Sequence, residues 1–275
     1  MGLRINTNLA SINAQRMLSK STAKIEKAQE RLASGYRINT SSDDVAGLAI
    51  AEQLRSVRRG EAQAERNAQN AISFIQVAEG GLSEVNNIII RQRELAVQAA
   101  SDTVGEQERG FLNLEAQQLK QELDRIVQTT EFAGMKLLDG SAGELDFQVG
   151  ARGGDDYKIS YDAGSANAST SELGISGLDI ADKGSAQSAL NDIDGALAKV
   201  GAMRANFGAV QSRMETTIAN LSVSQASFTA AESRIRDADM AAESSNLAQS
   251  AILREAGTAV LAQANANNQT ALKLL

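Results

Sequence analysis

The sequence predicts a mainly helical protein, in which long antiparallel helices with heptad patterns form a rod with a small β-hairpin at its far end. Three observations predict this fold class. The chain of 275 residues contains no proline, the residue that most strongly ends helices. Apolar residues recur at seven-residue spacing through both halves of the chain. The alternation of apolar and polar residues that is typical of strands is confined to one middle stretch.

The composition also excludes several functions. There is no cysteine and no histidine, so disulfides, thiolate metal sites and Ser-His-Asp triads are excluded. A net charge of −7 disfavours nucleic acid and anionic membranes as partners. No apolar run approaches the ~20 residues that span a bilayer, and the N-terminus lacks the apolar centre of a cleaved secretion signal. We therefore expect no enzyme, no cofactor and no membrane insertion.

The two ends of the chain carry thin apolar stripes among many Asn, Gln, Ser and Ala residues. Such stripes predict helices that order poorly alone and fold on partners. The N-terminal stripe holds Leu18, Ile25 and Leu32, and the C-terminal one includes Leu247 and Leu261.

A longer helix pattern follows the N-terminal segment and has two heptad rows. The first row holds Leu54, Ala68, Ile75, Leu82, Ile89 and Ala96 and is interrupted by Glu61. The second row holds Val57, Ala64, Ala71, Ala78, Val85 and Ala99 and is interrupted by Gln92. A third helix is expected after Ser101, Asp102 and Thr103, which are favoured N-cap residues. Its seam holds Leu112, Ala116, Leu119, Leu123 and Ile126.

The middle of the chain predicts a β-hairpin at about residues 144–162. Alternating apolar residues occur in "ELDFQV" and "YKISY", and residues 151–156 between them are turn-like. Residues 163–188, rich in Gly, Ser, Ala and Asp, predict an exposed surface loop. The last long helix has the strictest heptad row: Ile193, Val200, Phe207, Met214, Leu221, Phe228 and Ile235. Three such helices can bury one another's stripes, and both termini then lie at one end.

Two stretches resemble chemical sites, each with a structural alternative. Asp43 and Asp44 could bind a divalent metal, but no EF-hand pattern surrounds them. We favour a helix cap, in which Thr40, Ser41, Ser42 or Asp43 precedes a helix beginning near Asp44. The stretch "GARGGDD" lacks the Gly-Lys-Ser/Thr ending of a phosphate loop and is interpreted as a hairpin turn.

The stretch "IIIRQRELAVQAAS" places Arg91, Arg93 and Glu94 on or near the outer face of a helix. Charges in this position are usually a solvated face, but Arg beside Ile and Leu also suits a docking surface. The residues alone leave both interpretations open.

Four long motifs carry a family resemblance: "INTNLASINAQRML", "ERLASGYRINTSSDDVAGLAIAEQLRS", "RELAVQAA" and "DADMAAESSNLAQSAILREAGTAVLAQAN". With them the chain resembles the bacterial flagellins. The resemblance implies a structural subunit that polymerises, alone or together with other flagellins, into the extracellular flagellar filament for motility. It also implies export in unfolded form through the flagellar type III apparatus. The implied partners are an export chaperone, the filament cap and the hook–filament junction proteins.

The resemblance further implies that the terminal helices form an inner coiled coil at 1–42 and 235–275. An outer helical rod with the hairpin then occupies 43–234. The joint between them includes Gly35, Asn39, Asp43 and Asp44. We expect the apolar rows to act as self-assembly seams, through Leu18, Ile25, Leu32, Leu247, Leu261, Ile75, Leu82, Ile89, Ile193, Val200, Phe207, Met214, Leu221 and Phe228.

Flagellins are also recognised by a Toll-like receptor of animal hosts, and the family positions match Arg91, Leu95 and Glu115 here. The chain departs from many flagellins in its middle, where only about fifty residues take the place of large outer domains. Two other interpretations are weighed: a hook–filament junction protein, and a coiled-coil scaffold that forms a discrete dimer. A zinc protease insert, found in some flagellins, is excluded by the absence of histidine.

Overall fold

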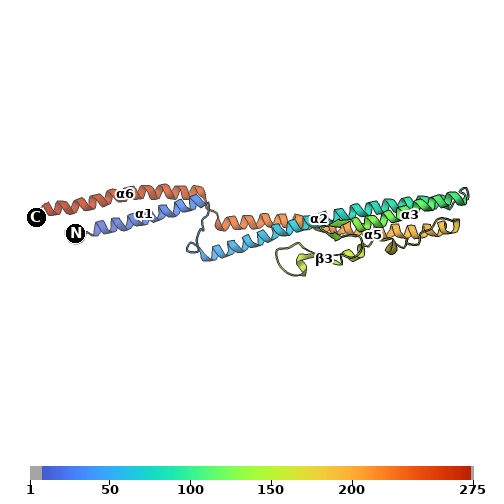
Figure 1. Cartoon of the computed structure of the whole chain (residues 1–275). Helices are drawn as coiled ribbons and strands as arrows, with labels where there is room; N and C mark the ends of the chain where they lie inside the picture. Colours follow the sequence, from blue (N-terminus) through green and yellow to red (C-terminus); the bar gives the residue numbers. More distant parts are fainter. Residues whose placement is uncertain (1–7, 274–275) are drawn as a thin grey trace. The chain divides into compact units, whose positions relative to one another are not determined.

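The computed structural model describes residues 8–273, with their side chains as far as residue 266 (Figure 1). Its helices are α1 (Leu9–Ser34), α2 (Val45–Ala99), α3 (Glu106–Thr129), α4 (Thr170–Leu173), α5 (Lys183–Arg236) and α6 (Met240–Lys273). Two antiparallel sheets pair β1 (Glu131–Phe132) with β2 (Met135–Lys136), and β3 (Glu144–Gln148) with β4 (Lys158–Asp162). The predicted mainly helical fold with a small hairpin is confirmed.

The chain forms two compact units, and we describe each by itself. The terminal unit comprises Met1–Ser56 with Ser227–Leu275, and the central unit comprises Val57–Ala226. Helices α2 and α5 therefore contribute residues to both units. The predicted division into 1–42 with 235–275 and 43–234 stays a prediction, and its first seven and last two residues lie outside the described part of the chain.

The central unit is built on α2 and α5, which run antiparallel, with α3 and the hairpin packed on them. Cross-helix contacts define the pairing: Arg93 of α2 meets Asp194 of α5 at 2.7 Å, and Arg204 of α5 meets Glu79 of α2 at 3.4 Å. The predicted rows form its core. Its buried row residues include Ile75, Leu82, Ile89, Leu123, Ile193, Val200, Phe207 and Met214. Full burial of a large apolar side chain stabilises the fold by about 1.5–3 kcal/mol, so these rows hold the unit together.

The hairpin lies along α2, and the far turn of the helices is made elsewhere. Asn67 donates to the carbonyl of Gln148 at 3.0 Å, and a Cβ at Gly60 would come within 2.8 Å of the Cβ of Ala151. The turn between α2 and α3 instead meets the start of α5, where Lys183 binds Asp102 at 2.7 Å. The predicted position of the hairpin at the far end is therefore corrected. Its apolar face is buried on the helices, where the Tyr161 and Phe207 rings lie 5.1 Å apart.

The segment from 163 to 181 is not the exposed loop that its composition predicts. Its apolar residues are buried: Ala163, Ala166, Ala168, Leu173, Ile175, Leu178 and Ile180. Side chains of α3 bind its backbone in sequence, as when Gln117 donates to the carbonyl of Leu178 and Lys120 to that of Ser176. The small residues let the segment lie close to α3. Its few large apolar residues are buried and hold it in place.

The predicted start of α3 is also corrected. The helix begins at Glu106 after Gly105, which makes no side-chain cap, so Ser101, Asp102 and Thr103 are not its N-cap. They lie in the turn that follows α2. There Arg109 donates to the carbonyl oxygens of Ala99 and Ser101 at 2.8 and 2.9 Å. These bonds satisfy carbonyl groups that have no partner inside α2.

In the terminal unit, α1 lies beside α6 in antiparallel orientation (Figure 1). Arg31 binds Glu243 near one end of the pair, and Asn8 donates to the carbonyl of Ala264 near the other. The fully buried positions on α1 are mostly small or polar, and Leu18, Leu32, Leu247 and Leu261 are only half-buried. The buried α1 residues are Ser11, Ala14, Ser21, Ile25 and Ala28. This is the thin seam that the sequence predicts.

A search of the described helices finds none with the length and hydrophobicity needed to cross a lipid bilayer.

Candidate functional site

The joint is formed by residues 35–44 and 237–239, which connect α1 to α2 and α5 to α6. It begins at Gly35, which ends α1 with a φ of +75° and donates its N–H to the carbonyl of Arg31 at 2.8 Å. Only glycine adopts this left-handed conformation without steric cost, so the chain turns out of the helix here.

The two connections pair with each other through their backbones. Arg37 N–H donates to the carbonyl of Arg236 at 2.6 Å, and Ala238 N–H donates to the carbonyl of Gly35 at 2.9 Å. Tyr36 and Asp237 thus form an antiparallel bridge. The Arg236 guanidinium lies 4.4 Å from the centre of the Tyr36 ring, a distance at which a cation–π interaction is favourable. The connections are therefore fixed to each other, although they are far apart in sequence.

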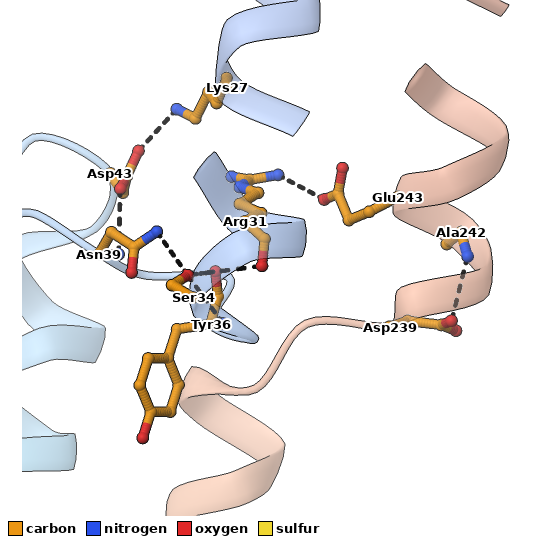
Figure 2. Close-up of polar contacts among 9 residues, drawn as sticks. All are labelled: Lys27, Arg31, Ser34, Tyr36, Asn39, Asp43, Asp239, Ala242 and Glu243. Carbon is orange, nitrogen blue, oxygen red and sulfur yellow. Dashed lines mark hydrogen bonds and ion pairs between the residues drawn. The ribbon is translucent and has the colours of Figure 1, made fainter. Parts of the chain in front are cut away.

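Asp43 organises the longer connection, as Figure 2 shows. Its carboxylate accepts hydrogen bonds from the backbone N–H groups of Asn39 and Thr40, both at 3.2 Å. It also forms an ion pair with Lys27 of α1 at 2.6 Å. The Lys27 ammonium, followed by these two amides, holds the pKa of the Asp43 carboxyl well below its usual range. The loop is thus tied to α1 by an ionised carboxylate.

Asp44 has a different role from its neighbour. Its side chain accepts the N–H of Gly47 at 2.9 Å, and its carbonyl accepts the N–H of Leu48. Asp44 is therefore the N-cap of α2, and the predicted cap residues Thr40, Ser41, Ser42 and Asp43 are corrected. Gly47 has to be glycine, because a Cβ there would lie 2.4 Å from the Asp44 carboxylate and 2.8 Å from Ile38.

A similar arrangement starts α6. Asp239 accepts the N–H of Ala241 at 2.9 Å and that of Ala242 at 3.1 Å; Figure 2 shows the second of these hydrogen bonds. Glu243, one turn further on, forms the ion pair with Arg31 at 2.7 Å, and both side chains are largely shielded from water. At the other side of the joint, Asn39 donates to the hydroxyl of Ser34 at 2.9 Å.

The predicted joint residues Gly35, Asn39, Asp43 and Asp44 thus all lie in this network. Sequence reasoning missed Lys27, Arg31 and Arg236, because heptad helices carry many such charges and nothing marks these three. The described residues contain no group of three acidic side chains that could hold a metal ion. Each carboxylate of the Asp43–Asp44 pair is already engaged with protein donors, which agrees with a structural joint.

The second predicted site is the outer surface of α2 and α3. Arg91 donates to Glu115 through Nε at 3.1 Å and through a terminal nitrogen at 2.9 Å, and to Glu94 at 2.9 Å. The hydrogen bond that Arg91 donates to Glu94, followed by those it donates to Glu115, raises the pKa of the exposed Arg91 guanidinium. Large apolar side chains are exposed on the same two helices: Ile90, Val97, Phe111 and Leu114.

Leu95, the third predicted receptor contact, is not on this surface. It is 1% exposed and belongs to the core of the central unit, so its predicted role as a direct contact is corrected. Residues three and four apart on a helix lie on neighbouring positions of its surface, yet Leu95 is buried in the core while Arg91, four residues earlier, is exposed. The exposed part of this site therefore consists of Arg91, Glu94 and Glu115.

The predicted self-assembly seams are also refined. Ile75, Leu82, Ile89, Ile193, Val200, Phe207 and Met214 are buried inside one chain, and Leu221 nearly so. They therefore close the central unit and are not free to contact a second copy. Phe228, like the terminal residues Leu18, Leu32, Leu247 and Leu261, is only half-buried. Ile25 is buried in the terminal unit.

Paired terminal helices, a joint whose two connections bind each other, and a helical central unit are the architecture of a helical structural protein. Comparison with known proteins defines it further. Residues 5–143 match the bacterial flagellin N-terminal helical region, and residues 190–275 match the bacterial flagellin C-terminal helical region. The chain therefore belongs to the bacterial flagellin family.

Individual relatives agree over the whole length. A flagellin of Halalkalibacterium halodurans is 45% identical over 98% of this chain and 99% of its own. The flagellar filament 33 kDa core protein of Treponema phagedenis is 40% identical over 98% of this chain and 99% of its own. The crystal structure of Bacillus cereus flagellin is similar at a TM-score of 0.50 and 28% identity, over 57% of this chain and 88% of that one.

As a member of this family, the chain is a non-enzymatic subunit that polymerises into the extracellular flagellar filament and serves motility. The interpretation as a flagellin is thus confirmed over that of an unrelated scaffold dimer.

Proposed function

We propose that the subunit is exported unfolded and that its two ends fold against each other only as it joins the filament. The thin seam of the terminal unit supports this proposal. Small and polar residues occupy most of the buried positions of α1, and Ser250 and Ala264 are the buried positions of α6 among the described side chains. Such a pair buries little apolar area, and isolated helix pairs of this kind are marginal in water.

The apolar residues that α1 and α6 leave exposed support the same proposal. They include Leu9, Ile12 and Met17 on α1, and Ile252, Leu253 and Val260 on α6. Exposed apolar residues on paired helices are typical of surfaces that other chains cover. Neighbouring copies would add the burial that the single chain lacks.

Hydrogen exchange of the full chain, as monomer and as seeded filament, tests this proposal. Amides of α1 and α6 should exchange freely in the monomer and become protected in the filament, while those of 82–89 in α2 stay protected in both. Electron microscopy of the same samples verifies that filaments form. Equal protection of α1 and α6 in monomer and filament would overturn the proposal.

We further propose that the monomer is recognised by the flagellin-sensing Toll-like receptor through Arg91 and Glu115. The side chains of Arg91 and Glu115 are exposed and bonded to each other. They support this role, because arginine is one of the residues that contribute most to binding at protein interfaces. Leu95 would act beneath them by fixing α2 on its core. Arg91→Ala should lower signalling in receptor-expressing cells at least tenfold.

Arg125→Ala is a matched control for this receptor test. Arg125 is an equally exposed arginine of α3 that pairs with Glu122 at 2.6 Å, so the variant loses a similar surface ion pair. It should signal normally. A full response to Arg91→Ala, or an equal loss for both variants, would contradict the assignment.

The remaining proposed partners are an export chaperone for the C-terminal segment, the filament cap and the hook–filament junction proteins. The exposed apolar residues of α6 support the chaperone in particular. Replacing Ile252 and Leu253 by serine should weaken binding of the unfolded chain to the chaperone of the same bacterium, measured by calorimetry. Unchanged affinity would remove this support.

A further inference from the structure

Glu61 is a carboxylate buried in the central unit beside the seam of α2 and α5. It is only 9% exposed, and it takes the place of an apolar residue in the first heptad row of α2. The hydroxyl of Ser224 donates to its Oε1 at 2.8 Å. Its Oε2 is buried and has no hydrogen-bond partner among the residues that the structure describes. A buried polar atom without a partner lowers the stability of the fold around it.

The neighbouring layers are also weakly packed. One turn further along α2, Glu65 accepts a hydrogen bond from Gln225 at 2.9 Å, so a second carboxylate faces α5. The buried residues next along α2 are Ala64 and Ala68, which are too small to fill much space. The far half of the same helix instead buries Phe74, Ile75, Leu82 and Ile89. The part of the central unit around Glu61 thus combines an unsatisfied carboxylate with a thin apolar core.

We infer that the layer of Glu61, Glu65, Ser224 and Gln225 is a built-in opening site, at which α2 and α5 separate locally before the rest of the central unit unfolds. Local opening begins where few apolar contacts and costly buried groups coincide. Opening hydrates both carboxylates and sacrifices little apolar burial. The turn of the hairpin lies on the adjacent residue, since Ala151 packs on Gly60, and this one contact would be lost in the same step.

This inference describes how the folded subunit begins to unfold, and it does not depend on the proposed route of export. An exported chain that has folded too early would have to open again, and the Glu61 layer provides the place. Because the experiment below measures amide exchange in the purified monomer, its failure would leave the export proposal untouched.

Hydrogen exchange of the full-length monomer tests the opening site. In the native chain, amides of 60–66 and 220–226 should exchange at least about tenfold faster than those of 82–89. Glu61→Leu removes the unsatisfied oxygen and should slow amide exchange in residues 60–66 and 220–226 by roughly tenfold or more. Ser224→Ala removes the donor that Glu61 has and should speed the same exchange.

Two further variants keep the test decisive. Glu61→Gln keeps the acceptor for Ser224 and removes the charge, so it should slow exchange even if the leucine variant folds poorly. Glu84→Leu is the control, because Glu84 is an exposed carboxylate of the same helix. Its replacement should leave the exchange rates of residues 60–66 and 220–226 unchanged. Uniform protection along α2 in the native chain, or unchanged exchange in both Glu61 variants, would overturn the inference.

Discussion

Adjacent residues of the same type have different roles at the joint, and their surroundings decide which. Asp43 and Asp44 have the same side chain, but one faces Lys27 and two loop amides, and the other faces the first turn of α2. Charge-assisted hydrogen bonds of this kind are stronger than neutral ones, so each carboxylate fixes a separate part of the connection.

Asp43→Asn should destabilise the filament at neutral pH, because the Lys27 ammonium loses its partner. The folded state lowers the pKa of Asp43, so its stabilisation is complete above the ordinary pKa of about 3.9 and is lost as the pH falls further. The thermal dissociation temperatures of native and variant filaments should therefore differ at pH 7, begin to converge only below about pH 4, and meet only as the pH approaches the lowered pKa of Asp43.

Asp44→Asn is the control for this experiment. Asparagine caps helices as well as aspartate does, so this variant should dissociate close to the native temperature at every pH. A difference between native and Asp43→Asn filaments that grows in acid would contradict the role of the ion pair.

Tyr161 is the second residue whose ionisation reports on the fold. Burial, with a smaller effect from Asp162, raises the pKa of Tyr161 to about 12. The raised pKa means that Tyr161 stabilises the fold fully below about pH 10, and that this stabilisation is lost as the pH rises through 12. Since the chain has three tyrosines and no tryptophan, absorbance at alkaline pH should resolve one late phenol. Tyr161→Phe should remove that late transition and leave the others.

At the scale of the elements, the large side chains determine how α2, α5 and the hairpin fit together. Phe74 makes edge-to-face contacts with Phe132 and Phe147, at 5.9 and 5.8 Å between ring centres, while Phe207 meets Tyr161. The chain has only nine aromatic residues, and five of them gather where strands meet helices. The hairpin therefore has a defined seat on the helices.

Phe207→Ala should destabilise the central unit by about 3–5 kcal/mol, because it leaves a cavity where the hairpin meets α5. Denaturant unfolding, followed by tyrosine fluorescence, measures the loss. Phe111→Ala is the matched control: Phe111 is 67% exposed on α3 and its loss should cost less than about 0.5 kcal/mol. Equal costs for the two phenylalanines would contradict the packing described.

At the scale of the whole molecule, the chain separates a well-packed central unit from a terminal unit with a thin seam. The proposed folding of the terminal unit on assembly suits this division, because the terminal helices would then become ordered only at the growing end of the filament. The central unit can then be stable in the monomer while the terminal unit gains its stability from contacts in the filament.

Removing residues 240–275 should abolish seeded filament growth, since α1 loses the helix it lies against. The central unit contains none of the removed residues, so its denaturant midpoint should stay within experimental error of the native one. Electron microscopy and denaturant unfolding of the same preparation measure the two effects. Filaments from the truncated chain, at native length and diameter, would show that α6 is dispensable for assembly.

The helices and the hairpin follow from the sequence, because each rests on local physics. Missing prolines and heptad rows specify long helices, Gly35 marks the end of α1, and alternation marks β3 and β4. The family motifs added the joint and the receptor positions. These features need no knowledge of distant neighbours.

Only the tertiary structure decided which side of an element faces inward and what it meets there. Leu95 lies beside exposed residues in sequence but is buried, and residues 163–181 look like a loop but lie packed on α3. Glu61 and Gln92 interrupt the rows as if they were surface residues, yet both are buried. Burial and partners depend on residues far away in the chain, such as Ser224 for Glu61, and no local pattern encodes those pairings.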